Sequence, residues 1–178
     1  MGELGFVISL TVGMLQLYGL VFLLGSFSVA TISDLRRMSA QVEFVEIWSL
    51  AVAVFFLMDI YGILVLGIDI LNGMLVHKWT MVLIFLFISN WRFGILFRMA
   101  KGDLIACVSV LMILPFIVGL MFLVLLKTAD FVMRPLLRKF GDGKAYPFIP
   151  VVFTATVCVF LVEVFLFAGR TLTVSSIF

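Results

Sequence analysis

The sequence predicts an all-α membrane protein, a polytopic bundle of about six transmembrane helices with both termini outside the cell. The prediction depends on the composition, on the length of the apolar segments and on the distribution of basic residues. Of the 178 residues, 65% are hydrophobic and only 12% are charged, and the mean hydropathy is +1.33. Soluble globular domains average about 25% charged residues. The composition therefore excludes a soluble domain, and the length indicates one integral membrane domain over residues 1–178.

Apolar segments of membrane length follow one another along the chain. A transmembrane helix needs about 20 consecutive apolar residues, and residues 4–33 contain no charge at all. Charged residues bound the segments, in chain order Asp34-Leu35-Arg36-Arg37, Glu43 with Glu46, Lys78, Arg98 with Lys101, and the polar stretch 127–144. The expected helices are 5–31, a segment from Ile47 that Asp59 and Asp69 interrupt, 79–97, an apolar run over 103–126, and 146–168.

The segment that begins at Asp103 decides between five and six crossings. One continuous span gives five crossings and leaves the basic stretch after it outside. Proline removes a backbone donor and clashes with the preceding turn. Pro115 therefore also permits one short helix over 103–114 and a second helix that returns over 115–133. This second interpretation gives six crossings, provided that residues 42–76 form one crossing and an outer segment, with no further span over 60–76.

The basic residues favour six crossings, because cytoplasmic segments carry an excess of Lys and Arg. With six crossings, ten of the twelve basic residues lie at the cytoplasmic side, and only Lys78 and Arg170 lie outside. Five crossings divide the same twelve residues into six and six. Six crossings also bring Asp34, Asp103 and the loop over 141–150 to the cytoplasmic face.

Ionisable side chains within the apolar segments are candidate functional residues, because a charge in the hydrocarbon costs free energy. Asp59 and Glu163 fall in the outer halves of their helices, where they could share a hydrogen bond and act structurally. Arg92, on the inner half of its span, is expected to reach the interface with its long side chain and is a candidate partner for a catalytic carboxylate. Solvated positions are expected for Asp69, Asp130 and Asp142.

Asp34 and Asp103 differ from the other acids because each marks the junction between a span and the cytoplasmic surface. Asp103 opens a helix whose N-terminal dipole favours an anion, and Gly102 beside it leaves room for close approach of a substrate backbone. Two adjacent carboxylates do not both ionise readily, so one stays protonated while the other activates water. Together the two residues offer the chemistry of an aspartic protease.

The surroundings of both aspartates resemble motifs of the type IV prepilin peptidases, above all the archaeal preflagellin and prepilin peptidases. Ser33-Asp34-Leu35-Arg36, followed by Val42 and Trp48, is similar to the first aspartate motif of this family at the inner end of the first helix. Ala100-Lys101-Gly102-Asp103 resembles the GxGD motif of these intramembrane aspartic proteases, with alanine in place of the first glycine. Pro147-Phe148-Ile149-Pro150 resembles the PF-x-P element that opens the last helix.

The resemblance implies an aspartic endopeptidase of the plasma membrane. It would remove the short basic N-terminal leader of prepilin or prearchaellin-like proteins at the cytoplasmic boundary, with Asp34 and Asp103 as catalytic residues and without a metal or cofactor. The paired CxxC motifs of many bacterial members, which also N-methylate their product, are absent from this chain, so no methyltransferase activity is implied. The residues expected to shape the site or contact the substrate are Arg36, Lys101, Gly102, Pro147, Phe148 and Pro150.

Three alternative functions stay open at this point. A presenilin-like member of the wider GxGD class is disfavoured, because neither a tyrosine beside Asp34 nor a Pro-Ala-Leu element at 147–150 is present. A small proton-coupled transporter or accessory subunit would relay protons through Asp59 and Glu163. A non-catalytic assembly protein would depend on neither pair of acids. The net charge of +2 gives no indication of nucleic-acid binding, so the expected partners are leader peptides and the lipid bilayer.

Overall fold

The structure, a computed structural model, describes residues 2–37, 42–65, 74–89, 99–140 and 146–175. Within these ranges the regular secondary structure is all helical, which confirms the all-α part of the predicted fold class. Six α-helices and a short 3₁₀ helix, η2, make up the described part. Their bounds are α1 Gly2–Arg37, α2 Val42–Val65, α3 Met74–Ser89, α4 Lys101–Ile113, α5 Phe116–Leu137, η2 Arg138–Phe140 and α6 Ile149–Ser175.

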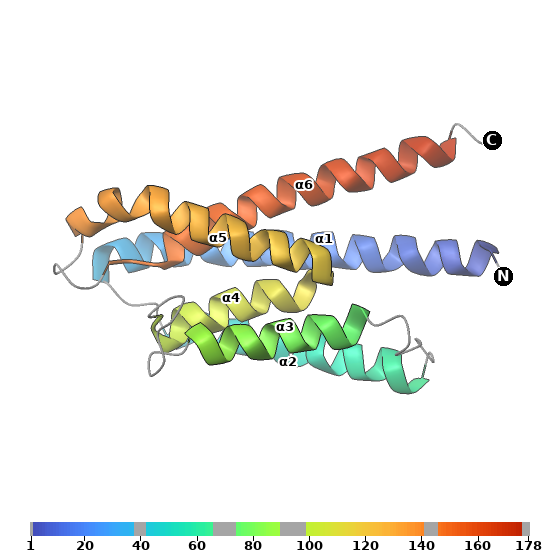
Figure 1. Cartoon of the computed structure of the whole chain (residues 1–178), viewed down its shortest axis with the longest axis horizontal. Coiled ribbons are helices and arrows are strands. Elements are labelled where there is room, and N and C mark those ends of the chain that lie inside the picture. Colours follow the sequence, from blue (N-terminus) through green and yellow to red (C-terminus); the bar gives the residue numbers. More distant parts are fainter. Residues whose placement is uncertain (1, 38–41, 66–73, 90–98, 141–145, 176–178) are drawn as a thin grey trace.

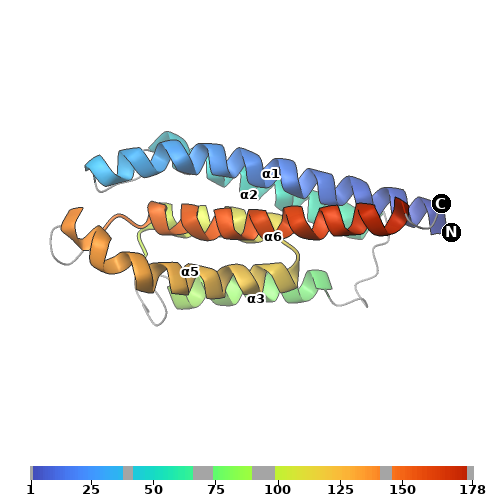
Figure 2. The same ribbon diagram turned by 90° about the horizontal axis from the view of Figure 1, so that it is seen from above.

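Successive α-helices run in opposite directions along the bundle. The C-terminal ends of α1, α3 and α5 and the N-terminal ends of α2, α4 and α6 gather at one end, whereas α1 begins and α6 ends at the other (Figures 1 and 2). Asp34 belongs to the last turn of α1 and Asp103 to the first turn of α4. We call the end that carries both residues the aspartate end. Because successive helices alternate in direction, both acids lie at the same end of the bundle, as the sequence predicts.

The chain reverses at Pro115, where α4 and α5 are separate, antiparallel helices (Figure 1). Leu114 and Pro115 between them are extended, with ψ angles of 143° and 155°. Proline cannot continue the hydrogen bonding of the preceding turn, so the helix ends before it. The predicted division into 103–114 and 115–133 is confirmed, and the second helix continues to Leu137.

The lengths of the helices suggest a multi-pass membrane protein. Three stretches are long and apolar enough to cross a bilayer, namely Gln16–Arg36, Val42–Gly62 and Phe116–Phe140, and shorter apolar helices cover Leu75–Ser89 and Ile149–Phe165. Large apolar side chains point outward from several helices, and the most exposed include Phe131 on α5, Leu64 on α2 and Phe165 on α6. Such a surface is unfavourable in water and suits the acyl chains of lipid.

The short helix α4 lies at the centre of the bundle and contacts all five other α-helices. Its residues from Ala106 to Ile113 are buried on every side. A helix that is apolar all round is a buried helix, and this one is covered by protein rather than by lipid. The central helix therefore carries Asp103 in its first turn, at the aspartate end.

Helix α2 is fixed to α1 through Trp48. The indole is fully buried, and its Nε1–H donates a hydrogen bond of 2.9 Å to the hydroxyl of Ser26. The indole also packs edge-on against Phe27 of α1, with 5.1 Å between ring centroids, and stacks on Phe44 of its own helix. Trp48, which the sequence pairs with the first aspartate motif, thus anchors the neighbouring helix.

The stretch 60–76 does not form a helix of its own in the described residues. Helix α2 continues through its first part to Val65, and α3 begins at Met74. One helix therefore precedes the intervening segment and one follows it, as the six-crossing interpretation requires. Asp69, expected in an outer solvated segment, lies outside the described residues.

Candidate active site

Asp34 and Asp103 come together at the aspartate end of the bundle. Asp34 is only 3% exposed, and Asp103 is half-buried. Helix α1 contacts α4 directly, and the two carboxyl groups are close enough for the charge of Asp34 to act on Asp103. Within the described ranges, the ion pairs of the protein involve other acids, and neither Asp34 nor Asp103 belongs to one.

The side chain of Asp34 is held by the N-terminus of α6. Its Oδ2 atom accepts a hydrogen bond of 3.1 Å from the backbone N–H of Ile149, and the backbone of Phe148 interacts with the same carboxyl group. The first N–H groups of a helix have no partner within that helix. Phe148 precedes α6 and has no side-chain acceptor for them, although its carbonyl accepts from Val151 and Val152. Asp34 supplies the missing acceptor from another helix, which explains why the PF-x-P element lies beside it.

Asp103 is the third residue of α4, and its carboxyl group turns back toward the backbone N–H of Ala100. Ala100 is the extended residue before the helix, and its own side chain cannot cap the first turn. An acid at the third helical position commonly closes such a turn by bonding back to the preceding residue. The same position lies at the positive end of the helix dipole. The local sequence thus fixes Asp103 by a backbone contact.

The other residues expected to shape the site fall into two groups. Pro147, Phe148 and Pro150 are buried in the segment that opens α6, and Gly102 is half-buried next to Asp103. Arg36 and Lys101 are exposed at the same end. Two further predicted residues lie outside the described residues: Arg92, the candidate partner for a catalytic carboxylate, and Asp142, the expected solvated acid.

Asp59 and Lys78 form an ion pair between α2 and α3. Lys78 Nζ donates to Asp59 Oδ2 at 2.7 Å, and the two side chains are 10% and 17% exposed, lysine first. The sequence suggested a hydrogen bond between Asp59 and Glu163, but it treated Lys78 only as a boundary residue. Two opposite charges at the outer ends of consecutive predicted spans are the signal that would have indicated this pair.

The prediction of a solvated position for Asp130 is wrong. Asp130 is completely buried on α5, where its carboxylate accepts hydrogen bonds from the hydroxyl of Tyr146 and from the guanidinium of Arg134. The Nζ atom of Lys127, on the same helix, lies 3.9 Å from Oδ2 of Asp130. The spacing of Asp130 and Arg134, four residues apart, places them on one helix face and could have indicated their pairing. The contact with Tyr146 forms because the chain returns toward α5 before α6 begins, and no local sequence pattern predicts this contact.

Tyr146 lies between η2 and α6 and joins this cluster to the aspartate end. The guanidinium of Arg134 lies over its ring, 5.8 Å from the centroid, and the ring of Phe148 lies 6.2 Å away. Burial, followed by the hydrogen bond to Asp130, raises the pKa of Tyr146 to about 12. The tyrosine is therefore a hydrogen-bond donor throughout the physiological pH range.

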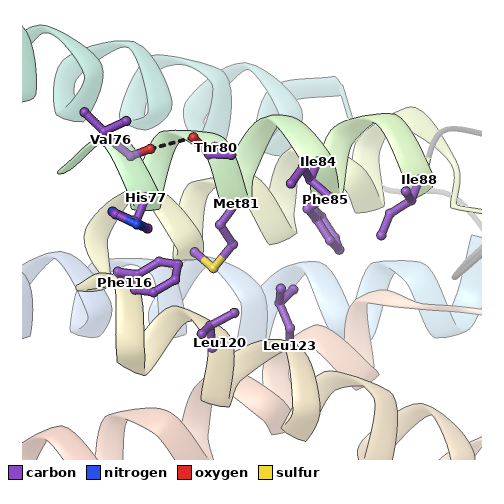
Figure 3. Close-up of a pocket in the computed structure, with 10 residues that line it drawn as sticks. All are labelled: Val76, His77, Thr80, Met81, Ile84, Phe85, Ile88, Phe116, Leu120 and Leu123. Atoms are coloured by element: carbon purple, nitrogen blue, oxygen red, sulfur yellow. Dashed lines mark hydrogen bonds between the residues drawn. The ribbon is translucent and has the colours of Figure 1, made fainter. Parts of the chain in front are cut away.

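A separate cavity of about 460 Å³ lies between α3 and α5. Figure 3 shows Met81 pointing from α3 toward Phe116 and Leu120 of α5. The two helices approach closely here, because a Cβ added at Gly119 would lie 2.6 Å from Met81 Cε. None of the residues predicted for the site lines this cavity, which is therefore distinct from the paired aspartates.

Within the described part of the chain, no group of three or more His, Cys, Asp or Glu side chains is arranged to hold a metal ion. The cysteines Cys107 and Cys158 are free thiols on α4 and α6. Comparison of the chain with protein-family models, with curated proteins and with solved structures finds no match. The functional argument therefore depends on the geometry of this chain.

Proposed function

We propose that the protein is an intramembrane aspartic endopeptidase, without methyltransferase activity. It removes the short N-terminal leader of prepilin or prearchaellin-like proteins at the cytoplasmic boundary of the plasma membrane. The position of Asp34 and Asp103 on the contacting helices α1 and α4, at one end of the bundle and with no basic partner among the described residues, carries the proposal. The resemblance of the three motifs around them to the prepilin peptidases gives the reaction and the substrate class.

In the proposed reaction, one carboxylate of the pair removes a proton from water while the oxygen attacks the scissile carbonyl carbon. The other carboxyl group, protonated at the start, donates its proton, and the carbon–nitrogen bond breaks with the amine as leaving group. General acid–base catalysis of this kind contributes about 10²- to 10⁴-fold to the rate. The backbone contacts of Asp34 and Asp103 support these roles, because they orient each carboxyl group without neutralising it.

The proposed topology has six crossings, with both termini outside and the aspartate end at the cytoplasm. The exposed basic residues Arg36, Lys101, Arg138 and Lys139 lie at this end, whereas Lys78 lies near the start of α3 at the other. This distribution follows the excess of basic residues in cytoplasmic segments. Helix α4 is too short to cross about 30 Å of hydrocarbon by itself, but the surrounding helices cover it.

The proposed substrate combines a basic leader with an apolar helix. The apolar helix packs against the exposed apolar surface of the bundle, so that the scissile bond lies at the depth of Asp34 and Asp103. Glu43 and Glu46 are exposed at the start of α2, at the aspartate end. Their negative charge attracts the leader. The half-buried Gly102 leaves room for the substrate backbone beside Asp103.

The test uses the full chain in detergent or liposomes with a leader peptide followed by its apolar helix. Wild type is expected to release the leader. We expect Asp34→Asn and Asp103→Asn each to lower the rate at least 100-fold, at the lower end of the range for acid–base catalysis. Asparagine can still accept the backbone hydrogen bonds of either site, so the fold is retained. Mass spectrometry of the product identifies the cut.

Asp59→Asn is the matched control, since it makes the same chemical change in an acid outside the proposed site. It should cleave at the wild-type rate per folded molecule. Cleavage by both Asp34→Asn and Asp103→Asn would refute the aspartic mechanism. A wild type inactive on several leaders, together with proton-coupled uptake that Asp59→Asn abolishes, would instead establish the transporter alternative.

A further inference from the structure

Asp130, Tyr146 and the start of α6 form a continuous series of contacts that leads to Asp34. Asp130 is completely buried and binds the hydroxyl of Tyr146. Tyr146 in turn lies against Phe148, and the next residue, Ile149, donates its backbone N–H to Asp34 at 3.1 Å. The three Cα-to-Cα steps from Tyr146 to Ile149 span at most about 11 Å. The position of the tyrosine therefore restricts where the N–H groups at the start of α6 can lie.

The contacts between Asp130 and Tyr146 are better suited to orient the tyrosine than to stabilise the fold. Burying a carboxylate costs free energy, and well-packed apolar residues in its place are often as stable or more stable. A hydroxyl bound to a fixed carboxylate, in contrast, holds the tyrosine ring in one direction. Pro147 further limits the backbone between Tyr146 and Phe148, because its ring fixes φ near −65°.

We propose that Asp130 and Tyr146 are positioning residues of the peptidase. They hold the segment 147–149 where its backbone N–H groups bind and orient Asp34. The proposal rests on the proposed function for its effect on catalysis, but the structural link from Tyr146 to Asp34 exists in the resting protein. Arg134 supports the same arrangement, because its guanidinium binds Asp130 and lies over the ring of Tyr146.

The decisive variant is Tyr146→Phe, which keeps the ring and removes only the hydroxyl. We expect kcat to fall roughly 10- to 100-fold with KM for the leader substrate unchanged, because a misplaced catalytic group slows the reaction more than it weakens binding. Asp130→Asn is expected to change kcat in the same direction. The matched control is Tyr61→Phe, at an exposed tyrosine of α2, which should leave both constants unchanged.

A second measurement does not depend on activity. Hydrogen exchange of the backbone over 148–152, followed by mass spectrometry, is expected to be faster in Tyr146→Phe and in Asp34→Ala than in wild type and in Tyr61→Phe. A merely structural tyrosine would lower the folded fraction and leave kcat per folded molecule at the wild-type value. That result, or unchanged exchange over 148–152 in Tyr146→Phe, would overturn the proposal. If wild type cleaves no leader, the proposed function fails, and the exchange measurement still decides whether Tyr146 positions Asp34.

Discussion

The acids at the α1–α4 contact and at the α2–α3 contact are held in opposite ways. Asp59 is bound to the ammonium of Lys78, which fixes its negative charge. Asp34 accepts a hydrogen bond from the backbone N–H of Ile149, Asp103 turns toward the backbone N–H of Ala100, and the two carboxyl groups lie within electrostatic range of each other. A backbone N–H orients a carboxyl group and leaves it able to exchange its proton with a neighbouring acid. The immediate partner of each acid, rather than its depth in the bundle, therefore distinguishes the structural role of Asp59 from the catalytic role that we propose for Asp34 and Asp103.

The largest expected effect is on the structural side of this comparison. Replacement of Lys78 by methionine leaves Asp59 without its cation in a largely buried position. Breaking a buried ion pair costs about 3–5 kcal/mol, and we expect a loss of about 3 kcal/mol in the free energy of unfolding. The double variant Asp59→Leu with Lys78→Met should recover most of it, because no unpaired charge remains.

Thermal unfolding in one detergent measures the effect, with Lys139→Met at the exposed η2 position as control. Equal stability of Lys78→Met and Lys139→Met would break the comparison, because Asp59 would then not depend on its ion pair.

A smaller effect is expected on stability at Asp34. Asp34→Ala leaves the N–H of Ile149 unsatisfied in a buried place, which costs about 1–3 kcal/mol. Asp34→Asn retains an acceptor and should unfold close to the wild type, although both variants are expected to lose the proposed peptidase activity. The difference between the two in the free energy of unfolding measures the hydrogen bond at the start of α6. If Ala and Asn are equally stable, Asp34 does not hold this helix.

The smallest effect concerns the pH dependence of Tyr146. Its pKa is raised to about 12, above the ordinary value of about 10, so the folded protein binds this proton more tightly than the unfolded chain. The resulting stabilisation is complete below about pH 10 and is lost as the pH rises through 12. Alkaline titration of tyrosinate absorbance should show a late component that Tyr146→Phe removes and Tyr61→Phe leaves. A pKa of about 10 for Tyr146 would contradict a strong hydrogen bond from its hydroxyl to Asp130.

Much of the helical framework follows from local sequence. Charged residues such as Asp34 and Lys101 lie near helix ends because a charge within an apolar segment of membrane length costs free energy. Pro115 separates α4 from α5 because it cannot continue a helix. The alternation of directions then follows from counting segments. The bond between Asp130 and Tyr146 could not be obtained in this way, because it joins α5 to the segment before α6.

The sequence by itself determined an apolar chain of helices that alternate in direction, and it placed Asp34 and Asp103 at the same end of the resulting bundle. Hydropathy, charged boundaries and proline act over a few residues, so they can be read along the chain. Only the tertiary structure decided that Lys78 binds Asp59, that Tyr146 binds Asp130 and that the start of α6 binds Asp34. Such pairings depend on which helices become neighbours when the bundle closes around α4, and hydropathy, charged boundaries and proline do not determine that choice.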